Sequence, residues 1–225
     1  MITANFVKKA LMAATGATVV TLAGGQAAVA VSINFGGSNL TTSSISDTVG
    51  GIGYTATGFS SNGNDRNVVR RSSGLGVQFS GGLSSLENPQ IDGLGFDETL
   101  RLNFNQIVTL TSASFSGVGD FTLPLVGRIN DEVRLIVDGV LFSSADIPGG
   151  NFLGTDQGTF TSLNITGKVF DFTVTDNNDS YFLSSIEVEP VPEPFTILGS
   201  LSALGAGTLM KKQHDKRQNK VKSDA

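Results

Sequence analysis

Apolar and polar residues alternate one by one through the middle of this 225-residue chain, and this pattern limits its fold more than any other feature. In the clearest run, Leu100–Phe104, the three apolar side chains fall on one face of an extended strand and the two polar ones on the other. The runs Phe170–Thr175 and Ser185–Glu189 alternate in the same way. Such a period of two predicts half-buried β-strands.

Turn-forming residues separate these runs. Asp138-Gly139 interrupts the apolar stretch Val133–Phe142, and both residues accept the positive φ of a two-residue hairpin loop. The segments Asn62–Asp65 and Asp176–Asp179 are also rich in turn formers, although their oxygen atoms could instead bind a cation.

A second strand is expected at Ile107–Phe115, after a short turn that follows Leu100–Phe104. Its apolar phase slips from Val108 and Leu110 to Ala113 and Phe115. A phase slip indicates a bulge or bend in the strand.

Further candidate strands lie at 31–35, 54–59 and 75–79, whereas helix-forming runs are almost absent before residue 195. No repeat of fixed period indicates a propeller or solenoid. Many short strands with closely spaced turns predict an all-β domain, built as a two-sheet β-sandwich. By analogy with carbohydrate-binding sandwiches a jelly-roll topology is expected, with an immunoglobulin-like sandwich as the alternative.

The charge distribution disfavours nucleic-acid binding. Residues 31–189 contain seven Lys and Arg against seventeen Asp and Glu, a formal charge of −10, and most of the remaining basic residues lie in the last fifteen positions. An acidic domain repels a phosphate backbone.

Two residue types needed for much catalytic chemistry are scarce. The chain has no cysteine, and its single histidine, His214, lies in the basic C-terminal segment. Disulfides, thiolate nucleophiles, serine–histidine catalysis and histidine-bound zinc therefore lack their residues.

The first thirty residues predict a helical secretory signal. Lys8-Lys9 supplies the positive start, Ala10–Leu22 the apolar stretch, and Ala28-Val29-Ala30 a small-x-small cleavage site. Cleavage by signal peptidase after Ala30 is expected, following export by the general secretion machinery. The apolar run is too interrupted to favour the alternative of a permanent N-terminal anchor.

Residues 190–225 contain three consecutive features. The motif Val191–Pro194 precedes an apolar segment, Phe195–Met210, and then a basic end formed by Lys211, Lys212, Lys216 and Arg217. Sixteen helical residues span about 24 Å, somewhat less than a bilayer's hydrocarbon core, so a short single transmembrane helix is expected. The basic residues would remain cytoplasmic.

Pro192-Glu193-Pro194, followed by a short glycine-containing helix and a basic cluster, resembles the sorting tail of PEP-CTERM proteins. The resemblance covers about residues 190–217. It implies recognition of Pro192, Glu193 and Pro194 by exosortase, a membrane-embedded processing enzyme of Gram-negative bacteria, and a link to exopolysaccharide or biofilm material. It also implies transient anchoring, followed by a cell-surface or extracellular location. A plain single-span anchor is the alternative.

The segment Glu87–Glu98 holds four carboxylates just before the clearest strand, and oxygen ligands on a glycine-bearing loop suit Ca²⁺. The calcium hypothesis assigns Glu87, Asp92 and Glu98 as ligands. The alternative is a solvated acidic loop.

The only cluster of basic residues in the domain, Arg66, Arg70 and Arg71, is expected to form ion pairs, with an acidic sugar as the alternative partner. Without tryptophan, Tyr54 and Tyr181 are the phenolic candidates for a glycan-stacking platform, although ordinary packing would also explain them. Together these features predict a non-enzymatic surface or matrix protein that binds extracellular polysaccharide. The alternative is a secreted glycan-active enzyme using paired carboxylates.

Overall fold

The structure is a computed structural model that describes residues 29–79, 89–123, 127–149 and 156–192, without the side chains of 120–129. All regular elements in these ranges are β-strands, which confirms the all-β prediction. The described residues contain no helix that is long and apolar enough to cross a membrane. In chain order the strands are β1 (Val31–Asn34), β2 (Leu40–Thr42), β3 (Ser44–Val49), β4 (Ile52–Ser60), β5 (Asp65–Arg71), β6 (Gly74–Gln78), β7 (Ile91–Asp92), β8 (Glu98–Val118), β9 (Asp120–Leu123), β10 (Gly127–Asn130), β11 (Glu132–Val137), β12 (Val140–Asp146), β13 (Asp156–Thr173) and β14 (Ser180–Pro190).

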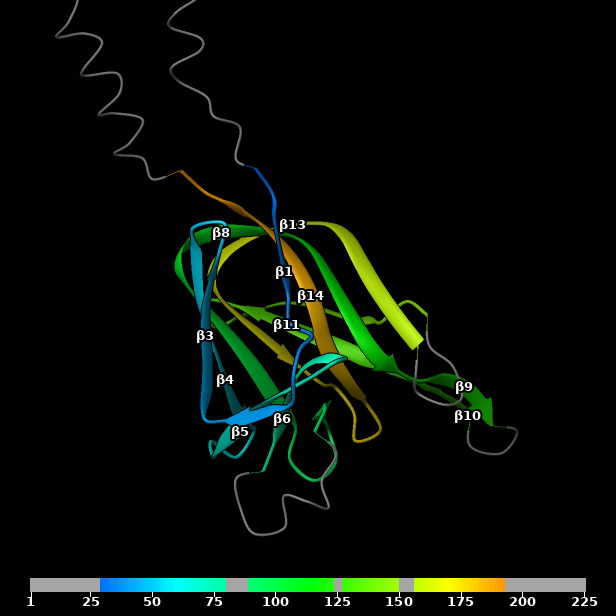
Figure 1. Ribbon diagram of the computed structural model, residues 1–225. Helices are drawn as coiled ribbons and strands as arrows, with labels where there is room; N and C mark the ends of the chain where they lie inside the picture. The colour runs from blue at the N-terminus through cyan, green and yellow to red at the C-terminus, as the bar shows by residue number, and fades with distance from the viewer. Residues whose placement is uncertain (1–28, 80–88, 124–126, 150–155, 193–225) are drawn as a thin grey trace, which may run out of the picture. The chain divides into compact units, whose positions relative to one another are not determined.

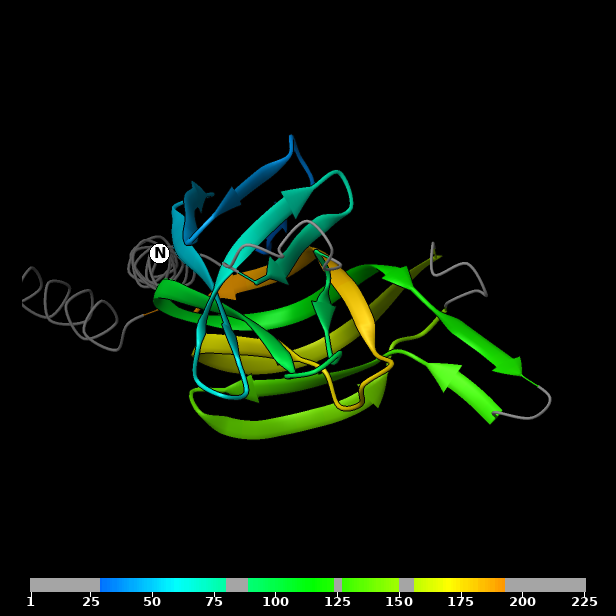
Figure 2. The ribbon, with the colours of Figure 1, turned by 90° about the horizontal axis from the view of Figure 1, so that it is seen from below.

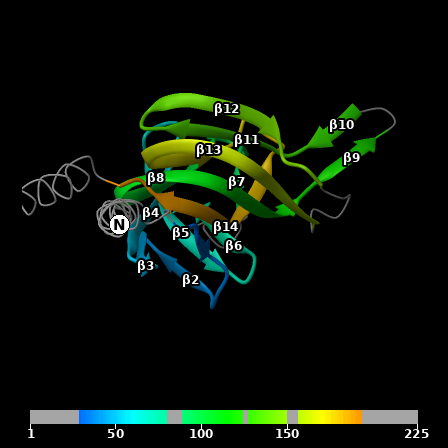
Figure 3. The same cartoon turned by 90° about the horizontal axis from the view of Figure 1, so that it is seen from above.

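Twelve of these strands belong to one hydrogen-bonded sheet, in which β8, β4, β5, β6 and β14 form a closed ring because β14 also pairs with β8. From β8 the sheet continues through β13 and β11 to β12, which follow one another in Figure 3. The two remaining strands, β9 and β10, form a hairpin that extends away from the others (Figure 2).

The long strand β8 joins the two parts of the sheet. Its first half pairs with β4 and its second half with β14, while β13 follows it along both. The predicted turn before Ile107 is wrong: the strand continues, and bends where the four residues Phe104–Ile107 lie opposite the single residue Lys168. The predicted bulge is confirmed at Thr111, which neither β13 nor β14 pairs, and whose hydroxyl donates to the Glu187 carbonyl at 3.2 Å.

The predicted alternation decides which side chains form the core. Leu100, Leu102 and Phe104 of β8 are buried, as are Phe170 and Phe172 of β13. The Phe104 and Phe170 rings meet edge to face with centroids 5.8 Å apart, the geometry that aromatic pairs prefer. The polar residues between them point to the opposite side of the sheet.

Both predicted types of turn are confirmed. Asp138 and Gly139 have φ of 50° and 81° in the two-residue loop between β11 and β12. Asn62–Asp65 leads from β4 into β5, and Asp176–Asp179 connects β13 to β14. Asp179 is buried, and its carboxylate accepts four hydrogen bonds that offset the cost of burial. The donors are the backbone N–H groups of Glu132, Thr175 and Asp176 and the Thr175 hydroxyl.

The two ends of the described chain leave from neighbouring strands, as Figure 1 shows for β1 and β14. Val31 pairs with Val188, and beyond β14 the Val191 N–H still donates to the Ile107 carbonyl at 3.1 Å. Residues Val29–Val191 form one compact unit.

Candidate functional site

The outward face of β3, β4, β8 and β13 is polar where these four neighbouring strands cross the middle of the sheet. The strand register places Ser46 beside Thr55, and Thr55 beside Asn103. Asn105 and Lys168 continue this face toward the bend of β8. The sheet thus gathers hydroxyl, amide and ammonium groups from segments more than a hundred residues apart in sequence.

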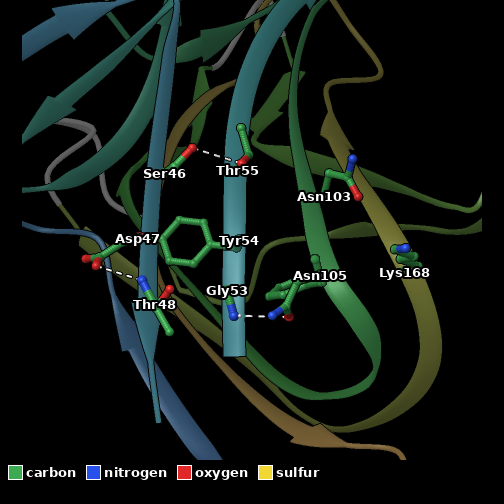
Figure 4. Close-up of a pocket in the computed structure, with 10 residues that line it drawn as sticks. Ser46, Asp47, Thr48, Gly53, Tyr54, Thr55, Asn103, Asn105 and Lys168 are labelled. Carbon is green, nitrogen blue, oxygen red and sulfur yellow. Dashed lines mark hydrogen bonds between the residues drawn. The ribbon is translucent and has the colours of Figure 1, made fainter. Parts of the chain in front are cut away.

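These side chains surround an open hollow of about 720 Å³ (Figure 4). Apart from Tyr54 and Phe104, whose rings pack into the core, its lining is polar or glycine. The lining residues are Ser46, Asp47, Thr48, Gly53, Tyr54, Thr55, Asn103, Phe104, Asn105 and Lys168. We call this feature the polar hollow.

Hydrogen bonds fix several groups of the polar hollow. The Gly53 N–H donates to Asn105 Oδ1 at 3.1 Å, so the Asn105 Nδ2 group remains to donate to a ligand. A Cβ on Gly53 would lie 3.2 Å from Asn105 Nδ2, so a larger residue here would require the amide to shift slightly. The hydroxyls of Ser46 and Thr55 share a 2.9 Å hydrogen bond. Asn103 is exposed, and its side chain bonds to no other described residue.

Charged groups lie at opposite ends of the polar hollow. Asp47 belongs to β3 and Lys168 to β13, three strand spacings or about 14 Å apart. Asp47 Oδ1 accepts the Thr48 N–H at 2.7 Å. Lys168 is the only lysine among the described residues and forms no ion pair with them.

An ion pair lies next to the polar hollow on the same outward face. Arg101 donates to both oxygens of Asp171 at 2.7 Å, and its guanidinium carbon lies 4.7 Å from the centre of the Phe59 ring. Sequence reasoning placed Arg101 on the outward face but missed this pairing, because the register that aligns Arg101 with Asp171 is set by strands seventy residues apart.

The two predicted glycan platforms are corrected by burial. Tyr181 is 0% exposed, and its hydroxyl donates to the Thr173 carbonyl at 2.8 Å. Burial raises the pKa of this hydroxyl well above its ordinary value, and the nearby carboxylates of Asp179 and Asp131 add to the rise. Tyr54 is 7% exposed, since its ring packs against Phe35 and Phe104. Neither ring offers a free face to a sugar.

Of the three predicted calcium ligands, Glu87 lies outside the described residues. Asp92 and Glu98 are brought together but buried: Glu98 Oε2 accepts the Asp92 N–H at 3.4 Å, and Asp92 Oδ1 accepts the Leu94 N–H at 3.1 Å. Among the described residues, no three His, Cys, Asp or Glu side chains gather as a metal site would require. Calcium binding stays a prediction.

The arginine cluster forms an ion pair at one of its three members. Arg66 Nε lies 3.8 Å from Glu98 Oε1, and the guanidinium also stacks 4.7 Å from the centre of the Phe79 ring. Arg71 instead donates to the backbone carbonyl of Arg70 at 3.1 Å. Because Arg66 is 7% exposed, it is not available to an acidic sugar.

The predicted processing sites lie at the two ends of the compact unit. Ala30 is exposed immediately before β1, and Pro192 is exposed immediately after Val191. The remaining predicted residues lie outside the described ranges: Ala28, Glu193, Pro194, Lys211, Lys212, Lys216 and Arg217.

No protein family, curated protein or solved structure matches this chain. The candidate site therefore rests on its own geometry. Its lining contains one carboxylate, Asp47, so the pair of acids that a glycosidase uses is not found in the polar hollow.

Proposed function

We propose that this protein is an exported, exosortase-sorted component of the cell surface or extracellular matrix, and that its β-domain binds polysaccharide in the polar hollow without catalysis. Signal peptidase, the secretion machinery and exosortase would act on its two ends. The membrane would hold it transiently through Phe195–Met210.

The observation that carries the saccharide proposal is the set of polar side chains that four neighbouring, paired strands bring together in the hollow. Sugar hydroxyls both donate and accept hydrogen bonds, and asparagine amides and hydroxyl side chains offer both functions. Groups held by strands lose little freedom on binding, which favours affinity. Asn103, Asn105 and Thr55 are the residues most directly presented to a ligand.

Two structural facts support the export route. Strand β1 begins at Val31, so cleavage after Ala30 would leave the whole strand in the mature protein. The compact unit ends at Val191, immediately before the Pro192–Pro194 motif.

We also propose that the strands of the domain pack as a two-layer sandwich. Assigning the strand pairings from backbone NMR tests this packing.

Binding is tested with a glycan array that includes the producer's own polysaccharide, followed by calorimetry on each hit. Replacing Asn103 with Ala should weaken binding at least several-fold, because one amide supplies both a donor and an acceptor. Asn67→Ala, which removes the same amide from β5 outside the hollow, is the matched control. An array without any hit would refute saccharide binding.

The sorting route is tested by measuring the intact mass of the protein recovered from the outer cell fractions. The expected species begins at Val31 and lacks the residues beyond 194. A mass that still includes Phe195–Met210 would contradict the route.

A further inference from the structure

We infer that the polar hollow selects acidic saccharides, with the carboxylate of a uronic acid residue bound at Lys168. This inference rests on the proposed saccharide binding and adds the chemical class of the ligand. It follows from the distribution of donors, acceptors and charge within the hollow.

Lys168 is held in a defined place on the sheet. The Asp138 carboxylate accepts the Lys168 N–H at 3.1 Å and the Val169 N–H at 2.9 Å, which fixes the backbone where it faces the bend of β8. The ammonium group, by contrast, forms no ion pair within the described part of the chain. It therefore presents a positive charge without a direct ion-pair partner at one end of the hollow (Figure 4).

Donors gather at this same end. The bond from the Gly53 N–H occupies Asn105 Oδ1, so Asn105 turns a donor toward the hollow, as Lys168 does. A carboxylate only accepts hydrogen bonds and matches such an end. The hydroxyls of Ser46 and Thr55, which can also accept hydrogen bonds from neutral sugar hydroxyls, lie toward the other end.

The net charge of the domain means that a preference for acidic saccharides can come only from short-range contacts. With a formal charge of −10 over residues 31–189, the domain repels acidic polymers at long range. A preference for an acidic saccharide must therefore come from a direct contact. An exposed ion pair accounts for up to about a fivefold gain in affinity.

The experiment compares tetragalacturonate and tetramannuronate, each as the free acid and as the methyl ester, by calorimetry on the intact secreted protein. The ester removes the charge and keeps the ring hydroxyls. We expect at least one acid to bind about three- to fivefold more tightly than its ester. Lys168→Gln should weaken acid binding to about the level of ester binding and so abolish this difference.

Arg134→Gln is the control, because it also removes one positive charge. Arg134 lies on β11 opposite Thr173, which is five residues or about 17 Å along β13 from Lys168. It should preserve the difference between acid and ester. Equal losses in the two variants, or esters that bind as tightly as acids, would overturn the acidic preference and leave saccharide binding intact. Acids that fail to bind while neutral glycans bind would do the same. If no saccharide of any class binds, the proposed function fails as well.

Discussion

The inward and outward faces of β4, β8 and β13 consist of alternate residues of the same strands, yet they differ in what holds them. On the inward face, Leu102, Phe104 and Phe170 are almost completely buried and pack against one another. On the outward face, Asn103 is exposed and Arg101 is held by a single ion pair. Stability should therefore depend on one set of residues and binding on the other.

The largest expected effect lies on the inward face. Phe104→Ala removes a ring that is 2% exposed and leaves a cavity beside Phe170, which should lower the free energy of unfolding by about 3–5 kcal/mol. Urea unfolding measures this loss. Asn103→Ala, one residue away, is the control, and a similar loss in both variants would break the distinction between the faces.

Tyr181→Phe tests a polar group inside the core. The variant leaves the Thr173 carbonyl without the hydroxyl donor, so a loss of about 1–3 kcal/mol is expected. Thermal unfolding at neutral pH measures this change. An unchanged melting temperature would show that this hydrogen bond contributes nothing net.

The same tyrosine predicts a pH dependence. Its folded pKa is raised above the unfolded value of about 10, so its contribution to stability is complete below pH 10 and is lost as the pH rises toward the folded pKa. Unfolding experiments between pH 9 and 12 should show a steeper decline for the natural protein than for Tyr181→Phe. Parallel curves would contradict the prediction.

Asp171→Asn tests the outward ion pair. The Arg101 side chain is 43% exposed, so solvent screens the interaction and the expected loss is about 1 kcal/mol or less, despite the two short hydrogen bonds. Unfolding in low and high salt should show that the loss shrinks as salt rises. A loss as large as that of Phe104→Ala would place part of the stability on the outward face.

The smallest effect on stability is expected for Asn103→Ala, within about 0.5 kcal/mol, because the side chain is exposed and bonds to no other described residue. The same variant should show the loss of saccharide binding. The free energy of unfolding and the saccharide affinity should be measured on one preparation of this variant. A folded variant that binds as tightly as the natural protein would show that Asn103 does not contact the ligand.

The alternation in the sequence predicts the core strands and the faces of Leu100–Phe104 correctly, because burial follows a local period of two. It does not predict which strands become neighbours. Asn103 meets Thr55 on one side and Val169 on the other only through the sheet register, which depends on the whole fold. The predicted turn after Phe104 is wrong for the same reason. Phe104–Ile107 are four residues of β8 opposite the single residue Lys168, and β8 continues because its pairing with β13 resumes at Val108.

The arrangement of β14 also determines how the domain would carry mechanical tension. A pull on Val191 runs along the axis of β14, which pairs with β8 over Phe182–Pro190. Val191 and Asn105 both lie at the Pro190–Val108 end of this antiparallel pairing, so tension between them would load that end first and open the pairs one after another. Because β8 also carries Asn103 and Asn105, force between a bound polysaccharide and the C-terminal end would cross a single pair of strands.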